Sequence, residues 1–119
     1  MLTKVYSASI QGIDAMAVTI ETDIGKGAAY NVSGLADTTV KESYDRIVAA
    51  MQHSGFSFPH MRITINLAPA DVRKTGPVYD LPLLVGLLAA QGVLPVPAPH
   101  QAFLGELGLD GTLRPVTGV

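Results

Sequence analysis

The sequence predicts a single α/β domain over residues 1–119, in which two helices pack on a mixed sheet in the order βββαβαββ. Three observations support this class: period-two alternation in several segments, a long apolar stripe at helical spacing, and glycine or proline turn signals between them. The 119-residue chain, with 48% hydrophobic and 15% charged residues, has the size and composition of one globular domain. Strand–helix–strand units favour some parallel pairing, and two hairpins favour antiparallel pairing.

Three strands open the predicted fold. Residues 2–10 and 15–24 are rich in β-branched and aromatic side chains and alternate apolar with polar positions. A glycine and an aspartate between them supply a turn, so the two segments are predicted to pair as a hairpin. A turn over residues 25–27 leads into a third strand over residues 29–32.

A first helix follows, with Asp37 or Thr39 as its cap and Gly55 as a left-handed residue at its end. Thr39 and Glu42 have the spacing of a capping box. The apolar residues of this helix form one stripe, made of Val40, Tyr44, Ile47, Val48 and Met51. The charged residues between them are predicted to face solvent: Lys41, Glu42, Asp45 and Arg46.

A strand and a second helix come next. In residues 61–67, MRITINL, apolar and polar side chains alternate without a break. A loop over residues 68–77 separates this strand from a helix that is capped by Asp80, has Pro82 in its first turn and runs to about Ala90. The helix is apolar almost all round, which predicts burial on most of its sides.

The last part of the chain is predicted to form a hairpin after a connector. Residues 94–100, LPVPAPH, are too rich in proline to be a central strand. Residues 101–109 are predicted to form a strand, Asp110 and Gly111 a turn, and residues 113–116 the start of the partner strand.

Composition and charge exclude several classes of protein. The formal net charge of −2 argues against indiscriminate binding to nucleic acids or membrane surfaces. The absence of cysteine excludes disulfides and Cys-based zinc sites. With no signal peptide and no apolar run long enough to span a bilayer, the chain is predicted to be cytoplasmic. The low charged fraction leaves few residues to solvate the surface, so we expect another domain or subunit to cover part of it.

No motif of catalytic or cofactor chemistry occurs in the sequence. It contains no G-x-x-x-x-G-K-[ST] phosphate loop, no G-x-S-x-G nucleophile elbow and no H-E-x-x-H zinc motif. The three histidines are isolated, whereas a zinc site needs three or four converging ligands. Glu106 lies between apolar residues, and a structural partner is favoured over catalysis. Arg114 can pair with Glu106 or with Asp110 across the hairpin. The sequence thus predicts no catalytic, cofactor or metal site.

Four stretches together resemble one family. They read VSGLADTTVKES from Val32, ITINLAPAD from Ile63, GPVYDLP from Gly76 and LGELGLDGTLRPV from Leu104. Each is moderately specific, and all four at these spacings are similar to the amino-terminal domain of the ComM/YifB family of magnesium-chelatase-like AAA+ ATPases. The resemblance covers essentially the whole chain.

The resemblance implies the fold of the Lon-type proteolytic domain, which GHMP kinases and a ribosomal protein share. It also implies a longer parent, truncated here before an AAA+ module that binds ATP and Mg²⁺. The expected parent is a hexameric ATP-driven DNA branch-migration helicase of natural transformation, and a chelatase-type ATPase for metal insertion is the alternative. The implied partners are the AAA+ module of the same chain, further copies of the parent and DNA, without a membrane.

A Lon-like hydrolase is a third hypothesis, against which the residues argue. The Lon-type nucleophile is a serine that follows a K-D-G-P segment and is activated by a lysine. The matching segment here is Lys74-Thr75-Gly76-Pro77, and the next residue, Val78, has no nucleophilic atom. The position of the activating lysine falls beyond Val119. We therefore expect this domain to be non-catalytic and its parent to be an ATPase.

Four basic residues are candidates for DNA contact, because lysine and arginine bind the phosphate backbone. Arg73 and Lys74 precede the second helix, with a solvated loop as the alternative interpretation. Arg62 lies on the polar face of its strand, and Lys41 lies near the start of the first helix. The aromatic rings are predicted to lie in the core or at its rim, where they are not platforms for base stacking.

Overall fold

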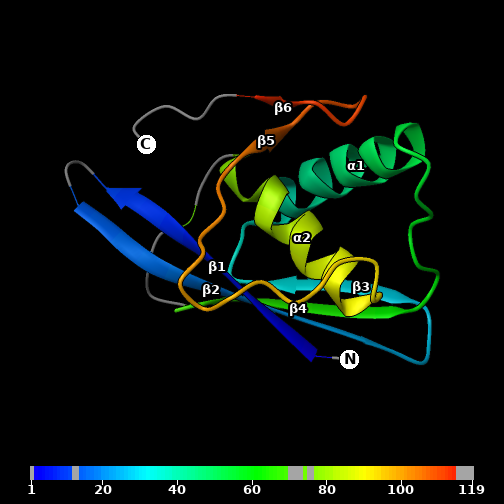
Figure 1. Ribbon diagram of the computed structural model, residues 1–119, viewed down its shortest axis with the longest axis horizontal. Coiled ribbons are helices and arrows are strands. Elements are labelled where there is room, and N and C mark those ends of the chain that lie inside the picture. Colours follow the sequence, from blue (N-terminus) through cyan, green and yellow to red (C-terminus); the bar gives the residue numbers. More distant parts are fainter. Residues whose placement is uncertain (1, 12–13, 70–73, 75–76, 115–119) are drawn as a thin grey trace.

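The computed structural model describes residues 2–11, 14–69, 74 and 77–114. Its elements follow in the order β1 (Leu2–Gln11), β2 (Asp14–Gly25), β3 (Ala29–Ser33), α1 (Asp37–His53), β4 (Arg62–Ala68), the 3-10 turn η1 (Pro77–Tyr79), α2 (Asp80–Ala90), β5 (Glu106–Leu107) and β6 (Leu113–Arg114) (Figure 1). This order confirms the predicted α/β class and the βββαβαββ succession. Among the described residues, no helix combines the length and the apolarity needed to cross a bilayer.

Four strands form one mixed sheet in the order β1–β2–β4–β3. β1 and β2 pair as the predicted antiparallel hairpin, with Val5 opposite Ile20. β4 joins β2 antiparallel, and β3 lies parallel to β4 on its other side. The parallel pair requires a crossover connection, which α1 provides. The prediction of both pairing types is therefore confirmed.

Both helices cover the same face of this sheet (Figure 1). In β4, Ile63, Ile65 and Leu67 are buried toward the helices, while the alternate residues are exposed on the other face, as the alternation predicted. From β1, the Thr3 hydroxyl donates to the carbonyl of Gly86 in α2 at 3.2 Å. This contact brings the helix backbone close to the sheet.

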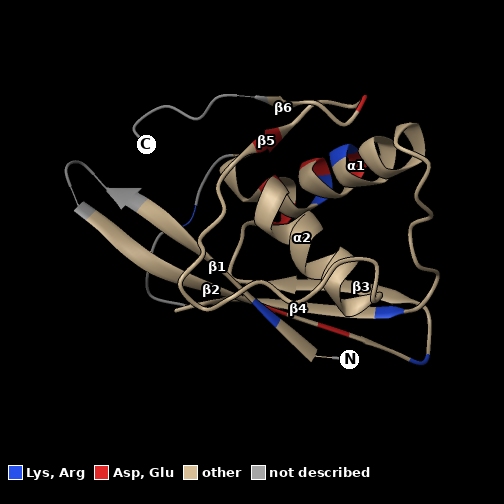
Figure 2. Ribbon diagram, in the orientation of Figure 1, with Lys and Arg blue, Asp and Glu red and all other residues tan. Residues whose placement is uncertain are grey.

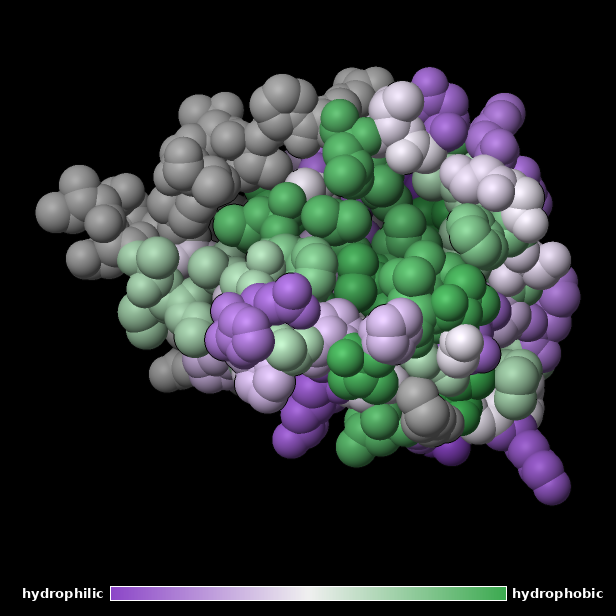
Figure 3. All heavy atoms as spheres, viewed as in Figure 1, coloured by the Kyte–Doolittle hydropathy of each residue, from purple (hydrophilic) through white to green (hydrophobic). Residues whose placement is uncertain are grey.

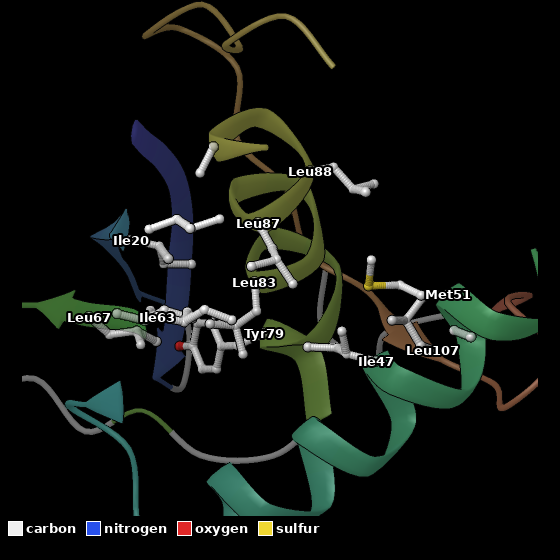
Figure 4. Packing of buried hydrophobic residues seen from close by; sticks show 14 of the residues in the cluster. Ile20, Ile47, Met51, Ile63, Leu67, Tyr79, Leu83, Leu87, Leu88 and Leu107 are labelled. Atoms are coloured by element: carbon white, nitrogen blue, oxygen red, sulfur yellow. The ribbon is translucent and has the colours of Figure 1, made fainter. Parts of the chain in front are cut away.

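The core lies between the sheet and the two helices. Nine of the eleven residues of α2 are buried, which confirms the predicted burial of this helix. The closely packed side chains come from β2, β4, η1, both helices and β5: Ile20, Ile47, Met51, Ile63, Leu67, Tyr79, Leu83, Leu87, Leu88 and Leu107 (Figure 4). The core is thus formed by residues from both ends of the chain.

Both helices begin differently from the prediction. α1 has Ala36 at its N-cap position, and no side chain caps its backbone, so neither the Asp37 or Thr39 cap nor the capping box forms. α2 continues directly from η1, whose last residue, Tyr79, already has helical backbone angles. Asp80 is therefore the first residue inside the helix, and its carboxylate is directed to a tertiary partner and not to the helix end.

The predicted strand over residues 101–109 is wrong in extent. Only Glu106–Leu107 pair with β6, and Ala102 makes an isolated parallel bridge to Tyr6 of β1. The backbone of Gly105 explains the interruption, because its amide donates to Val78 and its carbonyl accepts from Leu81. These hydrogen bonds attach the segment to the start of α2, so a longer strand cannot form there.

The predicted hairpin turn between β5 and β6 is confirmed. Gly111 has a positive φ of 91°, and the Asp110 carboxylate accepts a hydrogen bond from the Thr112 amide at 3.1 Å. That hydrogen bond lowers the pKa of Asp110. In the strand register Glu106 is opposite Arg114, one of the two partners that the sequence allowed for this arginine.

Candidate functional surfaces

Asp80 connects three elements in the interior. Its side chain is 1% exposed, and its carboxylate accepts hydrogen bonds from Arg46 Nε at 2.6 Å and Arg46 Nη2 at 3.0 Å. The backbone amide of Leu107 in β5 donates to the same carboxylate at 3.2 Å. The hydrogen bond to Asp80 raises the pKa of Arg46. A buried carboxylate held by a two-pronged arginine and an amide is a structural junction.

This junction overturns one prediction from the sequence. Arg46 was expected on the solvated side of the first helix, but it reaches across to α2 and its side chain is only 21% exposed. Helical spacing places Arg46 between the apolar stripe and the polar face. The long side chain of Arg46 can therefore point toward solvent or toward the core, and the ion pair with the buried Asp80 carboxylate directs it toward the core.

The segment before α2 holds the position where a Lon-type serine is expected. Val78 lies there in η1, where its side chain packs against the core and its carbonyl accepts from the Gly105 amide at 2.9 Å. Lys74 is 6% exposed, and its ammonium donates to the carbonyl of Pro69 at 2.6 Å. The structure therefore places the Lys74 ammonium against the backbone and not on an open surface. Arg73 lies outside the described residues.

Arg62 and Lys41 are both exposed but lie on different parts of the molecule. Arg62 is on the open face of the sheet, opposite Gly25 and next to the turn at Gly27. Lys41 is on α1, in the helical layer. Figure 2 shows basic and acidic residues interspersed along α1 and the sheet. Within the described part of the chain, the candidate residues therefore do not gather into one basic patch.

Three aromatic rings meet where β3, α1 and the segment before β4 converge. The ring centroids of Tyr30 and Tyr44 are 4.8 Å apart, and those of Tyr44 and Phe58 are 5.2 Å apart, both in edge-to-face geometry. Two hollows of about 250 and 220 Å³ adjoin these rings, and the exposed His60 borders both. Neither hollow is lined by a charged residue of the Asp, Glu, Lys or Arg type.

Sequence reasoning missed these hollows. Tyr44 was identified on the apolar stripe, but nothing in the local pattern indicated that Tyr30 and Phe58 would join it. The prediction that the rings lie in the core or at its rim holds for these three, which are half-buried. Within the ranges that the structure describes, no three His, Asp or Glu side chains gather where they could hold a metal ion.

Comparison with known protein families shows which family the chain belongs to. Residues 20–119 match the family described as subunit ChlI of Mg-chelatase. The chain belongs to this ChlI family. The matched range contains both helices, β3 to β6 and the end of β2, so the family match includes the junction at Asp80 and the aromatic hollows.

Several curated proteins are similar to this ChlI-family chain over nearly its whole length. Competence protein ComM of Haemophilus influenzae is 43% identical over 120 residues, covering 99% of this chain. Protein YifB of Escherichia coli is 43% identical over 119 residues, and an uncharacterized protein of Mycobacterium tuberculosis is 41% identical over 120. The chain spans 24% of the length of each relative. The assignment as an amino-terminal domain of the ComM/YifB type is thereby confirmed.

The motifs that carry the ChlI-family resemblance have structural roles in this chain. Gly34 has a φ of +95°, and a Cβ atom there would lie 2.4 Å from the carbonyl oxygen of Leu67. Asp80 makes the buried junction with Arg46. Gly105 leaves room for the Leu81 side chain, which a Cβ atom would meet at 3.2 Å. These positions shape turns and contacts between elements.

Proposed function

We propose that this chain is the non-catalytic amino-terminal domain of an AAA+ ATPase, and that its parent is an ATP-driven DNA branch-migration helicase of natural transformation. The observation that carries this proposal is 43% identity to a competence protein along 99% of the chain. In this proposal ATP and Mg²⁺ bind the AAA+ module outside residues 1–119. The parent assembles as a hexamer in the cytoplasm.

The chemistry of the segment before α2 supports a non-catalytic role for the domain. At the position of the Lon-type serine, Val78 offers only a half-buried isopropyl group. The nearby buried groups are engaged with the fold: Asp80 binds Arg46, and the Lys74 ammonium donates to a backbone carbonyl. A serine hydrolase needs a hydroxyl nucleophile with a base within hydrogen-bond reach, and Val78 supplies none.

In the intact protein the domain supports ring assembly or presents DNA to the motor. Arg62 and Lys41 are the two described candidates that are exposed, and phosphates are bound by lysine and arginine side chains at the surface. Arg73 stays a candidate from the sequence. The burial of Lys74 favours Arg62 and Lys41 over Lys74 as phosphate contacts.

A fork-binding experiment on the full-length protein tests this function. Forked DNA should be retarded in a gel shift and remodelled when ATP is added, and an Arg62→Ala/Lys41→Ala variant should bind more weakly with a smaller dependence on salt. Lys4→Ala is the matched control, because Lys4 is also exposed and lies opposite Glu21 on the sheet. Indifference of the full-length protein to forked DNA would contradict the proposal.

A chelatase-type parent is the second candidate, favoured by the family description, which names a subunit of Mg-chelatase. In that case the motor drives metal insertion into a porphyrin-like ring, and this domain again supplies structure. Incubation of the full-length protein with ATP, Mg²⁺ and a free porphyrin separates the two candidates, since metal insertion without fork remodelling supports only the second.

A further inference from the structure

The outward side of α2 is an apolar surface. Leu81, Leu84 and Leu88 recur at the i, i+3 and i+7 spacing that places side chains on one side of a helix. They lie away from the sheet, which the helix meets through residues such as Gly86. Between Leu81 and Ala90 the helix contains no charged residue. Most of α2 is buried, and the part that the fold leaves partly uncovered, at the half-buried Leu81 and Leu84, is therefore apolar.

Neighbouring segments extend this apolar surface at both ends of the helix. Leu113 of β6 is 58% exposed, and it lies beside Leu81, because both side chains adjoin Gly105. Phe56 is 42% exposed and borders a hollow of about 60 Å³ with Leu84 and Leu88. Figure 3 shows hydrophobic residues gathered over α2, from the β5–β6 hairpin to the segment that follows the helix.

We name this surface the α2 face and define it by the exposed Phe56, Leu94 and Leu113 and the half-buried Leu81 and Leu84; Leu88 borders it but is only 8% exposed. Leu94 is 39% exposed and follows the helix, with its amide directed to the Leu88 carbonyl. A contiguous exposed apolar patch on a small domain marks an interaction surface more often than isolated exposed leucines do. None of its residues is charged, so it offers no attraction to nucleic-acid phosphates or to anionic headgroups.

We propose that the α2 face is the docking surface for the ATPase module of the parent protein, through an apolar surface on that module. This inference rests on the proposed function only for the presence of such a module. The length of the relatives supports this occupant. Relatives that align along nearly the whole chain are about four times longer than it, because the chain spans 24% of them. About three quarters of such a protein therefore has to be accommodated against this domain or tethered beside it.

Cysteine labelling tests the docking directly. The chain contains no cysteine, so Leu113→Cys places a single thiol on the α2 face. Leu2→Cys is the matched control, because Leu2 is 59% exposed and lies outside the α2 face. Maleimide labelling rates are compared between isolated residues 1–119 and the full-length protein, and labelled peptides are identified by mass spectrometry.

The expected result is that labelling of Cys at position 113 slows by about an order of magnitude in the full-length protein, while labelling at position 2 is little changed. Equal rates at position 113 in both proteins would overturn the proposal. So would protection in isolated 1–119 that grows with its concentration, because a second copy would then be the occupant. The readout involves neither DNA nor ATP hydrolysis, so its failure is distinguishable from failure of the proposed function.

Discussion

Arg46 on α1 holds the carboxylate of Asp80 at the start of α2 through two hydrogen bonds, of 2.6 and 3.0 Å. The same carboxylate accepts from the amide of Leu107, so one buried charge connects both helices with β5. The residues of the pair are 34 positions apart in the chain. Pairing with Arg46 and the hydrogen bonds offset the desolvation cost of burying the Asp80 carboxylate.

Removal of Arg46 should therefore destabilise the domain strongly. Arg46→Ala leaves the Asp80 carboxylate buried without its counter-ion, and we expect a loss of about 3 kcal/mol in the free energy of unfolding. Urea denaturation followed by circular dichroism measures this loss. Lys41→Ala, an exposed cation on the same helix, should change stability by less than about 0.5 kcal/mol. Equal small effects for the two variants would show that the junction does not hold the helices.

Gly86→Ala should destabilise the domain although alanine is the better helix former. A Cβ atom at this position would lie 2.9 Å from Thr22 Oγ1 of β2, so the expected net loss is about 1 kcal/mol after the helical preference for alanine is included. In a Thr22→Ala background the clash is removed, and the same substitution should be neutral or stabilising. Urea unfolding of the two single variants and the double variant measures the coupling, and simple additivity would contradict this contact.

Thr22→Val should be neutral or stabilising. Thr22 is fully buried, and among the described residues its hydroxyl has no hydrogen-bond partner. Valine has nearly the same shape and replaces an unsatisfied hydroxyl by a methyl group, which removes the cost of desolvating that hydroxyl. A rise in the free energy of unfolding of up to about 1 kcal/mol is expected from urea denaturation. A loss above that size would indicate that the hydroxyl is bonded in solution.

Gly34→Ala should be much more damaging than Gly55→Ala. Both glycines have positive φ angles, 95° and 82°, so both substitutions carry the conformational cost of a left-handed residue, about 1 kcal/mol. At Gly34 the added Cβ would also lie 2.4 Å from the Leu67 carbonyl oxygen, whereas at Gly55 no atom lies within 4 Å. The midpoint of thermal unfolding measures the difference, and similar shifts for the two variants would count against a close contact between the β3–α1 turn and β4.

Tyr30 should make the domain lose stability in alkaline solution. Burial, followed by the nearby Tyr44 and Asp80, raises the pKa of Tyr30 above its ordinary value of 10.0. The folded protein therefore retains this proton to higher pH than the unfolded chain does. Its contribution to stability is complete below pH 10 and declines above it, by up to about 1.4 kcal/mol per pH unit.

Tyr30→Phe removes this contribution, so the fall in unfolding free energy between pH 9 and pH 11 should be smaller for the variant than for the unchanged protein. Burial also raises the pKa of Tyr79, so Tyr79→Phe should act in the same direction. Urea denaturation at several pH values measures the slopes. Parallel slopes for the unchanged protein and Tyr30→Phe would show that the Tyr30 phenol is not buried enough to resist ionisation.

Most elements of the fold were predictable because their signals are local. The alternation in β4 and the stripe of α1 each depend on residues a few positions apart, and both elements formed as predicted. The helix caps were not predictable, because their outcome depends on what competes for the side chain. Asp80 is a good cap by residue type, but a salt bridge to Arg46 holds its carboxylate.

The functional surfaces were less predictable than the fold. Lys74 was a candidate for DNA contact by residue type, but it is 6% exposed and its ammonium donates to the carbonyl of Pro69, which residue type does not reveal. The aromatic cluster beside the hollows brings together Tyr30 of β3, Tyr44 of α1 and Phe58 of the segment before β4. A local pattern reports which side of its own element a residue occupies, and it does not report which other elements come to that side.

By itself the sequence determined the class and order of the elements, the absence of a hydroxyl at Val78 and the family, because each depends on residue identity or local period. Only the tertiary structure decided that Arg46 turns inward, that Gly105 interrupts a strand and that the half-buried Leu81 of α2 lies beside the exposed Leu113 of β6. The physical reason is that charges, backbone amides and apolar side chains take the partner that packing brings near, and that partner is often distant in sequence.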